Sequence, residues 1–507
     1  MSEKILDLFV IGGGINGAGI ARDAAGRGLS VVMCEKDDLA QGTSSRSGKL
    51  VHGGLRYLEY YEFRLVREAL IEREVLLNAA PHIIWPMRFV LPHSPGDRPA
   101  WLVRLGLFLY DHLGGLKKLP GTRTLDLHRD PEGAPILNSY QKGFEYSDCW
   151  VDDARLVTLN ALDAAERGAT ILTRTRCVSA NCTPEAWVIT VQNTQTGEQQ
   201  TFRAKALVNA TGPWVLDIIH QVTQTRSSRN VRLVKGSHLI VPKFWEGQQA
   251  YLMQNNDKRV IFINPYEGDK ALIGTTDIPW EGDADAVTAD DSEQQYLLDA
   301  VNRYFKIQLC ASDVIARFSG VRPLFDDGKG NPSAVTRDYV FELDEQQPLP
   351  LLHVFGGKIT TFRKLAEHAL QKLGPFFPQM GPDWTRDAVL PGGEIADADF
   401  ESFLQTLKSN YRWLPQRLCK HYARLYGARL PRVLGEAKRV EDLGLHFGGL
   451  LYEAEVRYLV EKEWARQADD ILWRRTKHGL HLTEIQQQAF ADWFTTTYGA
   501  PRCAKAS

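Results

Sequence analysis

Three glycines near the N-terminus have the spacing that binds the pyrophosphate of a dinucleotide. Gly12, Gly14 and Gly17 fit the pattern G-x-G-x-x-G between an apolar run and a helical pattern. In this pattern the first glycine permits a tight turn, the second lets the backbone approach a pyrophosphate, and the third allows close packing of helix on strand. Glu35 lies farther along, at the position where an acid can bind a ribose hydroxyl pair and disfavour the 2′-phosphate of NADP.

Two strands and a helix are needed to position these residues. We expect buried strands at residues 6–11 and 29–34, with a helix at 15–27 between them that ends at Gly28. Residues 205–210 and 351–355 have the same buried-strand pattern, and each run leads into glycine. This predicts one nucleotide-binding sheet built from distant segments, with residues 81–149 and 236–318 forming a second, substrate-facing layer. A Pro- and Gly-rich stretch at 374–393 indicates a boundary before a helical domain.

NAD and FAD both use this glycine pattern, so the motif leaves the choice between them open. Two later features favour FAD. A polar loop of small residues, which includes Thr43, Ser44 and His52, can line the extended middle of a large cofactor. The turn Gly356-Gly357, which follows a strand, has a backbone that can cradle a flavin ring.

Composition excludes several classes of protein. The chain has 507 residues with 60 basic and 62 acidic side chains, so its net charge of -2 argues against a nucleic-acid binder. The 7 cysteines are scattered without a C-x-x-C pair, and no EF-hand loop occurs, so we expect no metal. The cysteine pattern and the absence of a leader-like N-terminus predict a cytoplasmic location.

The motifs taken together closely resemble the bacterial, aerobic FAD-dependent glycerol-3-phosphate dehydrogenases. The resemblance covers nearly the whole chain and rests on GGGINGAGIARDAAGRG, HGGLRY, YSDCWVDDARLV, VNATGPW, KGSHL, IGTTD, SGVRPL, GGKITTFRKLAEHAL and ILWRRTKHGL in this order. It implies an α/β fold with a glutathione-reductase-like FAD domain, an antiparallel-sheet substrate domain and a C-terminal all-helical domain. The two first domains would interleave over residues 1–385, with FAD segments near 1–80, 150–235 and 319–385, followed by the helical domain at 386–507.

The family's activity is the oxidation of sn-glycerol 3-phosphate to dihydroxyacetone phosphate by hydride transfer to FAD, with electrons passed to a membrane quinone. The resemblance therefore implies a homodimer attached to the inner face of the cell membrane that uses ubiquinone or menaquinone. The alternative is an FAD-dependent amine or 2-hydroxy-acid oxidase on the same fold, because two arginines and a lysine can also hold a carboxylate. An NAD-dependent dehydrogenase and a catalytically inactive cofactor-binding protein are further alternatives.

The same resemblance assigns roles to individual residues. Arg56 and Arg322 match phosphate-binding arginines, His238 the group that takes the hydroxyl proton, and Lys358 a cation near flavin and substrate. Tyr57, Lys235 and Thr275 would support the substrate. The cofactor would contact Gly12, Gly14, Asn16, Gly17, Glu35, Thr43, Ser44, Lys49, Leu50, His52, Gly53, Gly54, Cys177, Val178, Ala210, Thr211, Gly212, Gly356, Gly357, Lys358 and Thr360.

One departure from the family pattern is visible. The family has a run of small residues before the lysine, and Arg46 and Gly48 interrupt that run in TSSRSGKL. This predicts a change in one hydrogen bond to the cofactor.

An apolar stretch at 97–115 is too short to span a bilayer and has two interpretations. It contains Trp101 and Phe108, is broken by Arg104, and is followed by Lys117 and Lys118. Such a segment can lie in the membrane interface with its basic residues toward anionic lipid, or it can be a core helix of the second domain.

Overall fold

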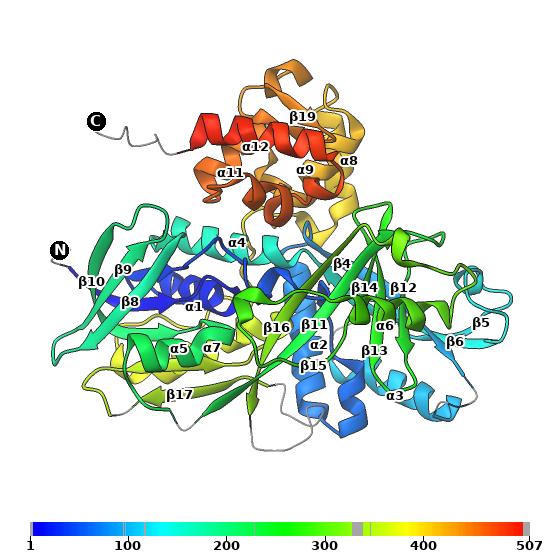
Figure 1. The fold of residues 1–507 in the computed structure, drawn as a ribbon, viewed down its shortest axis with the longest axis horizontal. Helices are drawn as coiled ribbons and strands as arrows, with labels where there is room; N and C mark the ends of the chain where they lie inside the picture. The colour runs from blue at the N-terminus through cyan, green and yellow to red at the C-terminus, as the bar shows by residue number, and fades with distance from the viewer. Residues whose placement is uncertain are drawn as a thin grey trace.

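The computed structural model describes residues 4–94, 96, 98–115, 118–227, 229–326, 338–344 and 346–499. Two large sheets lie beside one another, and the C-terminal helices sit above both of them (Figure 1). Lys117, one of the basic residues singled out above, is outside the described residues.

The first sheet is assembled from distant parts of the chain, which confirms the prediction. Its central strand β1 (Ile5–Ile11) is paired in parallel with β2 on one side and β10 on the other. The strand order is β17 (Val340–Asp344), β18 (Leu351–Phe355), β10 (Gln199–Asn209), β1, β2 (Val31–Cys34) and β7 (Thr170–Leu172), with β8 (Thr175–Cys182) and β9 (Trp187–Asn193) attached through β10. The carboxyl ends of β1, β10 and β18 therefore meet at one edge, where ligands of such sheets bind.

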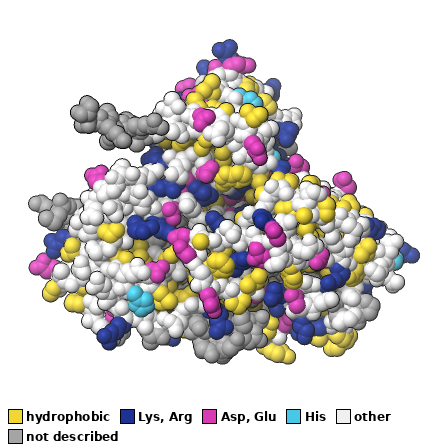
Figure 2. Space-filling view, in the orientation of Figure 1, with side chains coloured by type: hydrophobic (Ala, Val, Ile, Leu, Met, Phe, Trp, Pro, Cys, Tyr) yellow, Lys and Arg dark blue, Asp and Glu magenta, His cyan; other side chains and the backbone are white. Residues whose placement is uncertain are grey.

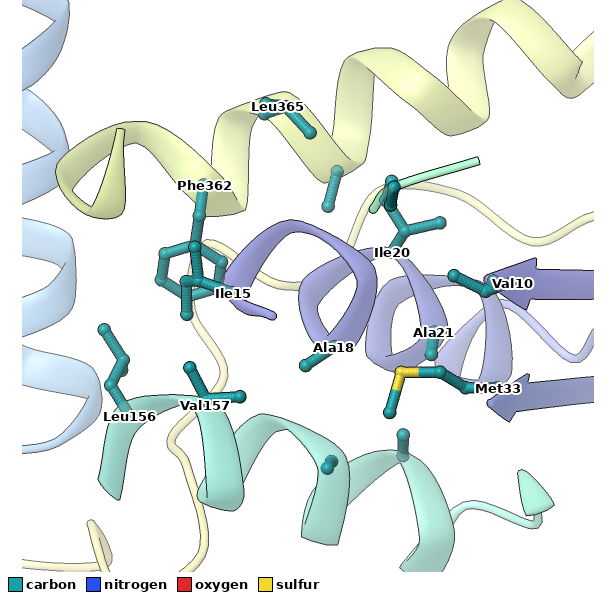
Figure 3. Packing of buried hydrophobic residues seen from close by; sticks show 14 of the residues in the cluster. Val10, Ile15, Ala18, Ile20, Ala21, Met33, Leu156, Val157, Phe362 and Leu365 are labelled. Atoms are coloured by element: carbon teal, nitrogen blue, oxygen red, sulfur yellow. The ribbon is translucent and has the colours of Figure 1, made fainter. Parts of the chain in front are cut away.

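Helix α1 (Ile15–Gly26) is the element that presents the glycine motif. It packs between α4 (Asp153–Glu166) and α7 (Phe362–Leu373), and Figure 3 shows Ile15 and Ala18 of α1 between Phe362 and Val157. Small residues on α1 allow this close approach, because a Cβ on Gly19 would lie 2.8 Å from the ring of Phe362. The buried apolar contacts on both sides fix the N-terminus of α1 at the sheet edge.

The second sheet is antiparallel except for one pair of strands. Strands β4 and β12 run parallel, which the sequence did not indicate. The order is β15 (Ile278–Pro279), β11 (Asn230–Pro242), β14 (Lys270–Gly274), β13 (Val260–Tyr266), β12 (Ala250–Gln254), β4 (Ile84–His93), β6 (Lys142–Val151) and β3 (Leu50–Val51), with β16 (Ala316–Asp326) on β11 and β5 (Arg123–Asp126) on β6. The helices that accompany it are α2 (Phe63–Ala79), α3 (Ala100–Leu113) and α6 (Asp291–Asn302), and a single turn, α5 (Val215–Asp217), follows β10.

The predicted segment boundaries at 235/236 and 318/319 fall inside β11 and β16, which both belong to the second sheet. Gly236 and Gly320 face each other in the continuous ladder between these two strands. A glycine pair in an antiparallel ladder leaves the backbone hydrogen bonds intact, so neither residue ends its strand.

The C-terminal part has its own apolar core and is helical, as predicted, apart from a small hairpin of β19 (His446–Gly448) and β20 (Leu451–Tyr452). Ion pairs attach it to the first sheet region. Arg475 contacts Asp38 at 2.8 Å, and Arg155 of α4 pairs with Glu463, both side chains being 0% exposed. The helices are α8 (Phe400–Asn410), α9 (Gln416–Tyr426), α10 (Leu430–Leu434), α11 (Glu453–Lys462) and α12 (Glu484–Tyr498).

Helix α3, which forms the apolar stretch, has one buried face and one exposed apolar face. Leu107 and Tyr110 are buried, whereas Trp101 is 69% and Phe108 50% exposed. Figure 2 shows hydrophobic side chains along the lower right edge of the molecule, where Figure 1 places α3. Among the described helices, none is long and apolar enough to cross a membrane.

Candidate active site

A large cavity runs between the two sheets. Its volume is about 1440 Å³, and its lining comes from the turn after β1, residues 40–58, the ends of β10 and β18, and strands β11, β13, β14 and β16 of the second sheet. The glycine motif therefore opens into the same space as the polar face of the second sheet.

The backbone leaves no room for a side chain at two of the motif glycines. Gly12 has φ +110°, and a Cβ there would lie 2.7 Å from the carbonyl oxygen of Ala210. A Cβ on Gly17 would lie 1.9 Å from the carbonyl oxygen of Gly12. These contacts hold the start of α1 against β1 and β10, so that its free N–H groups face a pyrophosphate.

Glu35 closes the far end of this site. It accepts a hydrogen bond from the N–H of Gly13 at 2.7 Å and one from the N–H of Asp37 at 3.0 Å. Burial raises the pKa of its carboxyl to about 7. The carboxyl lines the cavity at the end of β2, where a ribose would lie.

The turn after β18 is tied to the glycine motif. Asn16 Nδ2 donates to the carbonyl oxygen of Gly356 at 3.0 Å. Gly357 has φ +99°, and a Cβ on this residue would lie only 2.8 Å from Asn16. Ser44 Oγ accepts from the N–H of Ile15 at 3.0 Å. The buried Oδ1 of Asn16 has no partner among the described residues and lines the cavity. A glycine-rich turn beside the unpaired acceptor of Asn16 fits a flavin dinucleotide.

His238 and Arg322 project from one face of the second sheet. The ring of His238 stacks on Phe318 at 4.9 Å between centroids, and its Nδ1 is buried without a partner in the described structure. Burial, followed by the charges of Arg322 and Lys49, lowers the pKa of His238 to about 3, so the imidazole is neutral. Arg322 Nη2 donates to the carbonyl oxygen of Thr276 at 2.8 Å and lies 3.4 Å from Thr275 Oγ1.

Arg56, Tyr57 and Lys358 line the same cavity, the first two from the segment after β3 and Lys358 from the turn after β18. Lys358 Nζ lies 4.0 Å from the centre of the Tyr57 ring, is buried, and makes no hydrogen bond in the described part of the chain. Arg56 Nη2 lies 3.5 Å from the hydroxyl of Tyr60. Three cations and a neutral imidazole thus surround one space, which suits an anionic substrate that must lose a proton.

Most of the predicted cofactor residues line the cavity, and five predicted residues do not. Lys235 is buried against Glu293 at 2.7 Å and Lys49 against Asp153 at 2.8 Å, so neither ammonium reaches the cavity. Gly17, Gly53 and Val178 also lie outside the lining. The lining contains Gly12, Gly14, Asn16, Glu35, Thr43, Ser44, Leu50, His52, Gly54, Cys177, Ala210, Thr211, Gly212, Gly356, Gly357, Lys358 and Thr360, together with Arg56, Tyr57, His238, Thr275 and Arg322.

The sequence argument missed Asn264. This residue of β13 is 1% exposed, lines the cavity, and donates from Nδ2 to the carbonyl oxygen of Gly48 at 3.2 Å. The available signal was a polar residue inside the apolar run IFINPY, where a strand would otherwise bury only apolar side chains.

One group of described residues could hold a metal ion, and it lies away from the cavity. His421, Glu455 and His478 bring their ligand atoms within 4.8 Å of one another in the C-terminal part. Glu455 already accepts from Tyr426 at 2.7 Å and lies 3.2 Å from His421 Nε2. Hydrogen bonding accounts for this arrangement.

Comparison with known proteins identifies the family. Residues 7–361 match the family described as FAD dependent oxidoreductase, and residues 384–493 match the C-terminal domain of alpha-glycerophosphate oxidase. The aerobic glycerol-3-phosphate dehydrogenase of Escherichia coli is 52% identical over 96% of this chain and 97% of its own. The chain belongs to the family of FAD-dependent glycerol-3-phosphate dehydrogenases. It is therefore an FAD-dependent oxidoreductase, as the sequence predicted.

Two further relatives refine this assignment. The D-erythritol 1-phosphate dehydrogenase of Brucella abortus is 73% identical over 96% of this chain and 97% of its own. The crystal structure of the glycerol-3-phosphate dehydrogenase from Bacillus halodurans, complexed with FAD, is 28% identical, covers 98% of this chain and 95% of its own, and has a TM-score of 0.76. FAD is accordingly the cofactor, and the glycine motif and the Gly356-Gly357 turn are the candidate residues for its binding.

Proposed function

We propose that this enzyme oxidises a polyol phosphate at the secondary hydroxyl next to the phosphate-bearing carbon. D-erythritol 1-phosphate is the first candidate, because the relative of that name shares 73% of its residues with this chain. The sequence alone favoured sn-glycerol 3-phosphate, the second candidate, which relatives at 52% and 54% identity support. Both molecules carry a phosphate dianion beside a CHOH group, so one site chemistry serves both.

The observation that carries this proposal is that Arg322 and His238 lie on one face of the second sheet and line the same cavity as the glycine motif and the Gly356-Gly357 turn. The guanidinium of Arg322, with Arg56, binds the phosphate by charge-assisted hydrogen bonds and fixes the position of the next carbon. The neutral imidazole of His238 accepts the hydroxyl proton. FAD, when bound, would supply the acceptor for the carbon-bound hydrogen as hydride, so that the alcohol is oxidised to a ketone. Lys358 supplies positive charge beside the reacting atoms.

Substrate turnover distinguishes this function from its alternatives. Under anaerobic conditions, D-erythritol 1-phosphate or sn-glycerol 3-phosphate should bleach the flavin absorbance of the purified enzyme. Amino acids and 2-hydroxy acids, the substrates of the alternative oxidases, should leave it unchanged. The variant Arg322→Ala should keep its flavin and raise KM for the phosphate substrate by roughly tenfold or more, since a hydrogen bond to a charged group contributes about 1.5–3 kcal/mol. Normal KM in this variant would remove Arg322 from the site.

We also propose that the electrons pass to a lipid quinone and that α3 attaches the enzyme to the membrane surface. Support comes from the exposed apolar face of α3, where Trp101, Leu105 and Phe108 are 69%, 46% and 50% exposed. Tyr61, which is 81% exposed, also borders the cavity near this helix. Apolar side chains at such a surface can enter the headgroup region of a bilayer. Homodimer formation stays a prediction.

Vesicle binding tests the attachment. The enzyme should sediment with vesicles of phosphatidylglycerol and phosphatidylcholine, and Trp101→Glu/Phe108→Glu should remain in the supernatant with unchanged flavin content. Ile485→Glu serves as control, because Ile485 is 82% exposed and lies on α12 of the C-terminal part. Equal sedimentation of all three proteins would exclude α3 as the attachment site.

A further inference from the structure

The strand register places three polar side chains in a line across the second sheet. Arg322 of β16 is opposite Val234 of β11. His238 is also on β11, four residues after Val234. Asn264 of β13 is opposite Leu272 of β14, which is opposite Ile240 of β11. Side chains at even spacing along a strand and directly across neighbouring strands share one face. Arg322, His238 and Asn264 therefore follow one another on the face that borders the cavity.

This order extends the substrate site beyond the reacting carbon. A polyol phosphate whose phosphate is at Arg322 and whose reacting hydroxyl is at His238 continues toward Asn264. Neighbouring strands are about 4.8 Å apart. Two such spacings separate β11, which carries His238, from β13, which carries Asn264, and this leaves room for further carbon atoms. This reasoning rests on the proposed function, which places the phosphate and the hydroxyl at those two residues.

A hollow beside His238 lies in this direction. A Cβ on Gly48 would have one neighbour within 4 Å, the Nε2 atom of His238 at 3.8 Å. Gly48 borders the cavity, and its carbonyl oxygen accepts from Asn264 Nδ2 at 3.2 Å. Because Gly48 has no side chain, there is open space between His238 and Asn264, at the end of this series of polar residues.

Asn264 gives this hollow a polar end. Its Oδ1 is buried and has no hydrogen-bond partner among the described residues, although the residue is only 1% exposed. An unpaired buried acceptor costs about 1–3 kcal/mol, and a hydroxyl donor from a ligand would remove that cost. An apolar side chain would fill the strand position without this penalty, so the amide is suited to a hydroxylated ligand.

We infer that Gly48 and Asn264 form a subsite for an additional hydroxymethylene group, which selects four-carbon polyol phosphates such as D-erythritol 1-phosphate over glycerol 3-phosphate. Gly48 supplies the space. Asn264 accepts a hydrogen bond from the terminal hydroxyl of the four-carbon chain, which lies one carbon farther from the reacting carbon than any hydroxyl of glycerol 3-phosphate. Glycerol 3-phosphate is one CHOH group shorter and cannot fill both the phosphate site and this subsite. Selectivity in this enzyme then depends on residues that take no part in the redox step.

The test measures kcat/KM of the FAD-loaded enzyme for the two substrates. Gly48→Ala and Gly48→Ser fill the hollow without a backbone penalty, because Gly48 does not have a left-handed conformation. Asn264→Leu keeps the size of the side chain and removes the acceptor. Each variant should lower the ratio of kcat/KM for D-erythritol 1-phosphate to that for sn-glycerol 3-phosphate by roughly tenfold or more, as expected when a matched contact is lost.

Asn160→Leu is the matched control. Asn160 of α4 is 0% exposed, its Oδ1 also has no partner in the described structure, and it lies outside the cavity, so its loss should leave the ratio unchanged. Equal losses for both substrates, an unchanged ratio in the three variants, or a wild-type enzyme that oxidises only glycerol 3-phosphate would each overturn the subsite. A wild-type enzyme that oxidises neither polyol phosphate would instead refute the proposed function.

Discussion

Lys358→Met tests whether the lysine after the Gly356-Gly357 turn contributes charge to the reaction. The substitution keeps the length of the side chain and removes the ammonium. Nζ is buried, lies 4.0 Å from the centre of the Tyr57 ring, and makes no hydrogen bond to the described residues. The contact with the ring contributes about 0.5–2 kcal/mol and holds the ammonium in place. Because this contact exists before substrate binds, its loss does not by itself change kcat/KM.

The hydrogen bond that the ammonium gains with substrate or with developing charge does change kcat/KM. Such a bond to a charged group contributes about 1.5–3 kcal/mol, which corresponds to a roughly 10- to 150-fold fall in kcat/KM at about 1.4 kcal/mol for each factor of ten. The assay is steady-state turnover with a quinone analogue, normalised to bound flavin. Tyr57→Leu, which keeps the cation and loses the ring, should have a smaller effect. A turnover within about twofold of wild type at full flavin content would refute the reasoning, and loss of flavin would assign Lys358 to cofactor binding instead.

Three further outcomes follow from the packing. Gly17→Ala places a methyl group 1.9 Å from the carbonyl oxygen of Gly12 and should yield folded protein with little flavin, seen as lost visible absorbance at normal far-ultraviolet circular dichroism; full flavin content would contradict it. Glu463→Gln leaves the buried charge of Arg155 uncompensated and should destabilise the enzyme by about 3–5 kcal/mol, with a lower thermal midpoint that Arg155→Met/Glu463→Leu largely restores; equal midpoints for both variants would contradict this. Because burial and then nearby cations lower the pKa of His238 to about 3, NMR titration of the substrate-free enzyme should show no change of its ring signals near the ordinary pH of about 6.5, whereas an inflection there would show that the ring is solvated.

The cofactor half of the site could be predicted because its requirements are local. A strand, a tight turn and a helix start are encoded within a few residues, and the steric need for glycine is visible in the chain itself. The cavity indeed contains Gly12, Gly14 and Glu35. The second sheet was harder, because the segment boundaries predicted at 235/236 and 318/319 fall inside β11 and β16, which pair along their length. Pairing between distant strands has no local signature.

The substrate half could be predicted only in part, for a different reason. Lys235 and Lys49 have the same chemistry as Lys358, and nothing in their sequence contexts says which ammonium faces the cavity. Their burial partners decide it. Lys235 pairs with Glu293 at 2.7 Å and Lys49 with Asp153 at 2.8 Å, so both charges are compensated inside the protein.

The near-neutral total of 60 basic and 62 acidic residues therefore says little about anion binding. A cation attracts a phosphate in proportion to how poorly the protein itself compensates it, and that depends on distance. The ammonium of Lys358 faces an aromatic ring and makes no hydrogen bond within the described residues, whereas the ammonium groups of Lys235 and Lys49 contact carboxylates. An anionic substrate can therefore reach the Lys358 ammonium without displacing a hydrogen-bonded carboxylate. Specificity for an anion thus arises in a neutral protein from the positions of its carboxylates, and the neutral amide of Asn264 extends the same principle to the uncharged end of the substrate.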